Sequence, residues 1–172
     1  YWGQLSISKV YADNRELTHY IGIYEDITEA KLAQQRIERL AYTDNLTNLG
    51  NRPAFIRSLE ERFSHNSNTP TCLLLVDIDN FKRINDSLGH QTGDKLLISL
   101  ARRLRNSLCP GGSLARFASN EFAVLLDDTD IEAGQATANQ LLMTLDKPMF
   151  VDNQLISVTG SVGVACAPIH GH

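Results

Sequence analysis

The chain has 172 residues, 42% of them hydrophobic, which suits one core of ordinary size. Its net charge of -4 and pI near 5.7 exclude sequence-independent binding of nucleic acid, which requires a surplus of Lys and Arg. The cysteines Cys72, Cys109 and Cys166 are odd in number and include no C-x-x-C pair, so neither a disulfide framework nor a zinc site is indicated, and a reducing cytoplasm is expected. No apolar run approaches the ~20 residues of a membrane span, and no leader opens the sequence, so a soluble chain is expected.

Residues 1–27 contain two runs of alternating apolar and polar residues with the turn-prone pair Asp13-Asn14 between them. This pattern predicts a strand, a turn and a strand. A two-stranded ribbon is marginally stable alone, so we expect this part to be the end of a larger upstream domain.

A helix is predicted next, because Asp26 and Glu29 match a capping box and helical spacing continues to about Ala41. Small or apolar residues form one stripe that suits a parallel helical partner: Ala30, Ala33, Ile37 and Leu40. Fewer than two heptads do not specify a coiled coil, so an inter-domain helix is the better supported interpretation.

The rest of the chain alternates helical and strand patterns. The run at 71–79 is continuously apolar and too short for a helix, which is typical of a strand buried on both faces. The "CPGG" run at 109–112 ends the helix predicted at 92–108. The order predicts an α/β sandwich with helices packed on one mixed sheet. The predicted elements are helices at 53–63, 92–108 and 131–146, strand 71–79, a hairpin at 114–126, and closing strands at 150–158 and 160–167.

Two carboxylates follow the buried strand. Side chains alternate along a strand, so Asp77 and Asp79 project on the same side and suit a hard divalent cation. The alternative is that both acids only cap the following turn.

The segment "DIDNFKRINDSLGHQTGD" (77–94) resembles the GGDEF domains, diguanylate cyclases that condense two GTP into cyclic di-GMP. It matches a D-x-D-x-F-K-x-I-N-D-x-x-G-H-x-x-G-D signature at every fixed position, and 44–55 and 161–165 extend the likeness. The resemblance implies a GGDEF domain at 44–172 that lacks its usual C-terminal helix. Its fold would be α/β, with a central, mainly antiparallel sheet flanked by helices and a ferredoxin-like core, as in nucleotidyl cyclases and polymerase palms.

The N-terminal part resembles the last strands of a PAS sensor domain (1–27) followed by a signalling helix (28–43). Such a helix is compatible with a homodimer, and the sequence leaves open whether this one dimerises. The arrangement also implies a PAS-GGDEF-EAL type protein, in which a downstream EAL domain cleaves cyclic di-GMP.

The resemblance assigns roles in a GTP site. Asp77 and the Ile78 carbonyl would hold Mg²⁺, and Lys82 would meet the GTP phosphates as a point charge. An amide and a carboxylate, Asn85 and Asp94, would read the guanine edge. Alternatively, Asp94 is a first-turn helix acid and Asn85 a turn residue. Other residues implied at the site are Phe81 and His90 as GTP contacts, and Gly89 and Gly93 as glycines that permit a sharp backbone path.

The family's name motif is altered here, because the segment 118–122 reads Ala-Ser-Asn-Glu-Phe in place of Gly-Gly-Asp-Glu-Phe. In the family the two glycines let a hairpin turn lie against the nucleotide with dihedral angles closed to other residues. Asn120 replaces the usual acidic metal ligand, so weak or absent Mg²⁺ binding is expected, and Glu121 is a vestige of the catalytic machinery. The altered motif comprises Ala118, Ser119, Asn120, Glu121 and Phe122.

A second departure concerns the family's inhibitory Arg-x-x-Asp site. Cys109 and Gly112 stand at its two positions, so that site is absent.

Two functional hypotheses follow. The first is a catalytically silent GGDEF domain that senses GTP and regulates an adjoining domain, expected to be an EAL phosphodiesterase. The second is a slow diguanylate cyclase that uses Asp77 and Glu121. A scaffold that binds no ligand is the remaining alternative.

Overall fold

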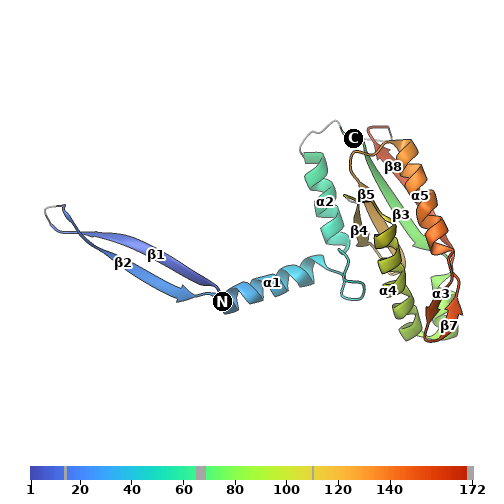
Figure 1. Ribbon diagram of the computed structural model, residues 1–172, viewed down its shortest axis with the longest axis horizontal. Helices are drawn as coiled ribbons and strands as arrows, with labels where there is room; N and C mark the ends of the chain where they lie inside the picture. Colours follow the sequence, from blue (N-terminus) through green and yellow to red (C-terminus); the bar gives the residue numbers. More distant parts are fainter. Residues whose placement is uncertain (14, 65–68, 110, 170–172) are drawn as a thin grey trace. The chain divides into compact units, whose positions relative to one another are not determined.

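The computed structural model divides the chain into two units, Tyr1–Leu40 and Ala41–His172 (Figure 1). The turn expected at Asn14 and the helix stop expected at Pro110 fall on positions that the structure leaves undescribed. It describes residues 1–13, 15–64, 69–109 and 111–169.

The first unit is a two-stranded ribbon followed by a helix. Strand β1 (Gly3–Tyr11) pairs antiparallel with β2 (Leu17–Asp26), as the alternating pattern predicts. Helix α1 (Thr28–Tyr42) begins where Asp26 Oδ1 accepts a hydrogen bond of 2.9 Å from the Thr28 backbone N–H. Hydrogen bonds from Thr28 hold the pKa of the Asp26 carboxyl below its usual range. No residue of α1 is buried.

The second unit is built on a four-stranded sheet of order β4-β5-β3-β8. All of its strand pairings are antiparallel, and the one parallel contact among the described residues is an isolated bridge between Gly50 and Ala115. The predicted α/β class with a mainly antiparallel sheet is therefore confirmed. The strands are β3 (Thr71–Ile78), β4 (Ser113–Arg116), β5 (Glu121–Leu126) and β8 (Gly160–Ala167).

Helices cover both faces of this sheet (Figure 1). On one face α2 (Arg52–Ser64) places Phe55 on the small cluster that includes Ala123 and Leu125. The other face carries the main core, where alternate β3 residues meet α4 (His90–Ser107) and α5 (Ile131–Leu145). Each fully buried Leu there contributes about 1.5 to 3 kcal/mol. None of the described helices combines the length and hydropathy needed to cross a bilayer.

The segment between β3 and α4, which the sequence pattern predicts to be a connection, contains a helix, α3 (Phe81–Leu88). Phe81, Ile84 and Leu88 have helical spacing, so the signal was present. Gly89 separates α3 from α4 with φ of +86°, a conformation that a side chain would strain.

The predicted closing strands are wrong in their pairing. The run at 150–158 folds on itself as a ribbon of β6 (Met149–Val151) and β7 (Gln154–Ile156). Asp152 and Asn153 both have positive φ, as a two-residue hairpin turn requires. Strand β8 pairs with β3 instead.

Cys72 and Cys166 form a disulfide, contrary to the expectation that no cysteines pair. They are 94 residues apart, but the antiparallel register of β3 and β8 sets them directly opposite each other. Sequence spacing carries no information on that register, so the argument from the cysteines for a reducing compartment does not hold.

Candidate nucleotide site

A cavity of about 600 Å³ lies at the end of β3. The end of β3, helix α3, the start of α4 and the turn between β4 and β5 supply its walls. It brings together eight of the predicted residues, Asp77, Ile78, Phe81, Lys82, Asn85, His90, Ser119 and Asn120, and adds Asn80 and Asp86. Lys82 and His90 are exposed.

Four of the predicted GTP contacts and altered-motif residues do not line this cavity. Phe122 is fully buried in the core, and Glu121 is half-buried on β5 directly opposite Asp77. Asp94 is exposed in the first turns of α4, and Ala118 is exposed in the hairpin turn.

Asp77 and Asp79 are not a carboxylate pair. The Asp79 carboxylate accepts hydrogen bonds from the hydroxyls of Thr159 (2.8 Å) and Ser161 (3.0 Å). Its backbone N–H donates to the Thr159 carbonyl at 3.0 Å. Asp79 lies beyond the end of β3, where strand alternation no longer applies, so it fixes the chain beside β8 while Asp77 faces the cavity.

Asn85 lies against Gly93 on the neighbouring helix. A Cβ added to Gly93 would stand 1.9 Å from Asn85 Oδ1 and 3.3 Å from the Phe81 ring. Gly93 therefore provides room for the Asn85 amide, and the expectation that it eases the backbone path is wrong, because its φ is not positive. Among the described residues, buried Asn85 Oδ1 has no hydrogen-bond partner.

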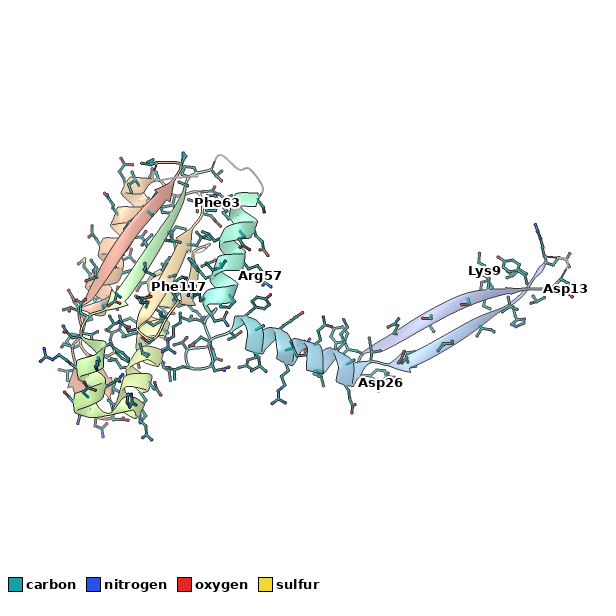
Figure 2. All side chains as sticks on the ribbon, turned by 180° about the vertical axis from the view of Figure 1, so that it is seen from behind. Lys9, Asp13, Asp26, Arg57, Phe63 and Phe117 are labelled. Atoms are coloured by element: carbon teal, nitrogen blue, oxygen red, sulfur yellow. A yellow bond between two sulfur atoms is a disulfide. The ribbon has the colours of Figure 1, made fainter. Side chains whose placement is uncertain are left out.

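The turn between β4 and β5 closes without glycine. The backbone N–H groups of Phe117 and Ala118 both donate to the Glu121 carbonyl, at 2.8 and 3.3 Å. Ala118, Ser119 and Asn120 have no positive φ, so this turn needs none of the left-handed conformations that glycine favours. Phe117 (Figure 2) packs edge-to-face on Phe55 of α2, with ring centroids 6.0 Å apart.

The Asn120 side chain binds the two groups that the resemblance assigns to Mg²⁺. Its Nδ2 donates to Asp77 Oδ2 and to the Ile78 carbonyl, both at 3.1 Å. Its Oδ1 accepts from the Ser119 hydroxyl at 3.0 Å. Mg²⁺ requires oxygen ligands, and here a nitrogen donor faces the other two ligands, so the residues as arranged do not fit the cation. No cluster of three His, Cys, Asp or Glu occurs among the described residues.

Arg116 supports the turn, a role that the sequence analysis missed. Its Nε and Nη2 donate to the Ser119 carbonyl at 3.3 and 2.7 Å, while Nη1 contacts both Asp44 carboxylate oxygens. Partial burial acts to raise the pKa of Asp44, but hydrogen bonds from Thr47 and the Arg116 guanidinium outweigh it, so the pKa lies below its usual value. In the sequence, this contact could have been suspected from an Arg next to the altered motif and an acid in the 44–55 segment.

Cys109 and Gly112, which the resemblance places at the family's inhibitory site, line a second cavity of about 520 Å³. Arg105 on α4 is the charged side chain in its lining. The two replacements bring no charge to that surface.

Comparisons with known proteins agree with the signature. Residues 41–172 match the family described as diguanylate cyclase, GGDEF domain. The chain is 36% identical over 146 residues to the cyclic di-GMP phosphodiesterase PdeR of Escherichia coli, covering 85% of this chain and 22% of PdeR. It is 39% identical over 127 residues to the diguanylate cyclase DgcP of Pseudomonas aeruginosa, covering 72% of this chain and 19% of DgcP.

A solved structure is similar as well. The coiled coil and GGDEF domain of DgcB from Caulobacter crescentus, in complex with c-di-GMP, superposes with a TM-score of 0.71 at 28% identity. The match covers 82% of this chain and 83% of that one. The chain spans about a fifth of the length of the two curated relatives.

Proposed function

Because the chain belongs to the GGDEF diguanylate cyclase family, we propose that it contributes to cyclic di-GMP signalling as a catalytically silent domain that binds GTP and regulates an adjoining domain. The main observation behind this proposal is the difference between the two sides of one cavity. The helical side keeps the residues suited to a guanine nucleotide, whereas the turn side has exchanged an acid for an amide.

GTP binding is supported by the Asn85 side chain, which lines the cavity and carries an amide that can pair with the edge of a base. Lys82 lines the same cavity and supplies a positive charge for phosphate oxygens.

Catalytic silence is supported by Asn120. In the family the corresponding acid helps to hold Mg²⁺ during phosphoryl transfer, and removing one such group commonly costs orders of magnitude in rate. Here Asn120 is uncharged, and its amide is already bound to Asp77 and Ile78.

Regulation of an adjoining domain is supported by the relatives, since one of them is a cyclic di-GMP phosphodiesterase about five times longer than the matched region. We assign residues 1–27 to the end of a PAS domain, 28–43 to a signalling helix and 44–172 to the GGDEF domain. The exposed stripe of α1, which includes Ile37 and Leu40, suits pairing with a second copy of the helix. An EAL domain is the proposed regulated partner.

Titration calorimetry with GTP tests the proposal, with ATP as the matched control because it differs only in the base. We expect GTP to bind and ATP to bind at least about tenfold more weakly, because the Asn85 amide cannot pair equally with both bases. If neither nucleotide binds, GTP sensing is refuted and only a scaffold role survives.

A slow cyclase is the second candidate, because Glu121 and Asp77 are direct partners in the β3–β5 ladder. Incubation with labelled GTP separates the two functions. The silent domain yields no more cyclic di-GMP than a Glu121→Ala control, whereas product above that control supports the cyclase.

A further inference from the structure

We propose that the Asn120 amide is a built-in replacement for a divalent cation: its NH₂ group bridges the Asp77 carboxylate and the Ile78 carbonyl and thereby closes this position to metal ions. The substitution then does more than remove a ligand. The inference concerns the protein without nucleotide and does not depend on whether GTP binds.

The chemistry of the contacts fixes the orientation of the amide. An NH₂ group has two hydrogens, and it faces two acceptors, Asp77 Oδ2 and the Ile78 carbonyl, each 3.1 Å from Nδ2. An ionised carboxylate and a carbonyl can only accept. The inverted amide would place its oxygen against both of them and turn its NH₂ group away from the acceptors.

Ser119 holds the other end of the amide. Its hydroxyl donates to Asn120 Oδ1 at 3.0 Å, which satisfies the oxygen that would otherwise be free to turn toward a cation. In the family's own motif this position is Gly, which has no hydroxyl. The two altered residues therefore act together, one as the bridge and the other as its clamp.

The backbone delivers the amide to this place. The Ile78 N–H donates to the Asn120 carbonyl at 3.1 Å, so the residue is tied to the end of β3 through its main chain as well. Arg116 fixes the preceding carbonyl, that of Ser119, with two N–H groups. Because the turn is held on both sides of the amide, the bridge is pre-organised.

Electrostatics explain why this arrangement disfavours metal. The bridge satisfies Asp77 by hydrogen bonding while Asn120 adds no negative charge, and a low charge count in the ligand set weakens divalent cation binding. A cation would also have to break the bridge to Asp77 and Ile78 and turn the amide away from Ser119. With Asp at position 120, two carboxylates would face each other, and a divalent cation between them would relieve their repulsion.

The test counts bound Mn²⁺ by electron paramagnetic resonance on the whole chain without nucleotide. Wild type is compared with Asn120→Asp and with Asn139→Asp, a matched control that makes the same charge change at an exposed position on α5. We expect Asn120→Asp to bind one Mn²⁺ at least about tenfold more tightly than wild type, and the control to match wild type. Equal Mn²⁺ binding by wild type and Asn120→Asp, whether tight or absent, overturns the proposal.

A second measurement takes its metal readout from the wild-type protein, so it does not require Asn120→Asp to fold. The Asn120 side-chain NH₂ resonances are assigned by their loss in Asn120→Ser. We expect them to stay sharp in 1 mM Mn²⁺, because no paramagnetic ion occupies the adjacent position. Their selective broadening would show a metal at Asp77 and refute the bridge. Failure of GTP to bind in calorimetry leaves both readouts unchanged, so the two proposals fail separately.

Discussion

The two sides of the cavity differ in how tightly their residues are built into the fold. On the helical side, the Asn85 amide occupies space that exists only because residue 93 is a glycine without a side chain. Phe81, on the same helix as Asn85, is buried. On the turn side, Ala118 and Ser119 are exposed, and their backbone avoids the glycine-only region. Substitutions in the turn therefore cost the fold little, whereas substitutions between the helices disturb packing. This contrast explains how a chain can vary in the turn between β4 and β5 and keep the residues between α3 and α4 that we propose contact the nucleotide.

The largest effect is expected from Gly93→Ala. The new Cβ would stand 1.9 Å from Asn85 Oδ1, so the amide must move, at a cost of about 1 to 3 kcal/mol in unfolding free energy. GTP affinity should fall by at least about tenfold with it. Denaturant unfolding measures the loss of unfolding free energy, and calorimetry measures the loss of GTP affinity. Gly163→Ala is the control, since its Cβ meets nothing within 4 Å, and an equal loss in both variants would contradict the packing difference.

Next, Lys82→Ala should weaken GTP binding about tenfold, because a charge-assisted contact to phosphate is lost. Arg83→Ala removes the same charge from the adjacent position of α3, but Arg83 does not line the candidate site. Calorimetry with GTP on both variants decides whether the contact is specific. Equal weakening would indicate only a general effect of net charge.

On the turn side, Arg116→Ala should lower the unfolding free energy by about 1 to 2 kcal/mol, because the Ser119 carbonyl and Asp44 both lose a donor. Arg57→Ala breaks an exposed pair with Glu61 at 3.6 Å and a cation–π contact 4.1 Å from the Tyr42 ring centroid, and its cost should stay below about 1 kcal/mol. Chemical denaturation compares the two. A cost for Arg116→Ala as small as that of Arg57→Ala would mean that the turn does not depend on its guanidinium.

The smallest expected effect is a pH dependence from Asp44. Its pKa is lower in the folded protein than in the unfolded chain, so its contribution to stability is present above the unfolded value, about pH 4, and is lost as pH falls through the folded value. The stability difference between wild type and Asp44→Asn should therefore be constant from pH 5 to 7 and shrink below pH 4. Denaturation across this range measures it, and a difference that grows on acidification would contradict the sign.

Local patterns predicted the layered α/β fold, and the family resemblance of the 77–94 segment predicted most of the cavity lining. The apolar run of β3 and the signature after it were readable because burial and motif are written in consecutive residues. The pairing of Cys72 with Cys166 was not, since it depends on the register of two strands 94 residues apart. The contacts of Asn120 also depend on tertiary placement, because the turn and β3 meet only in the folded sheet. The turn at Asp152-Asn153 was visible in the sequence and was interpreted as part of one strand.

The Ile78 carbonyl gives the cavity a property that mutational scanning cannot detect. The Ile78 side chain is fully buried, so replacing it reports on core packing. The backbone oxygen of residue 78, which accepts a hydrogen bond from Asn120, remains in every variant that folds. A deep mutational scan would thus score position 78 as purely structural. An edit of the main chain, an ester in place of the peptide bond between Ile78 and Asp79, would weaken that acceptor, and it would also remove the Asp79 N–H that donates to the Thr159 carbonyl.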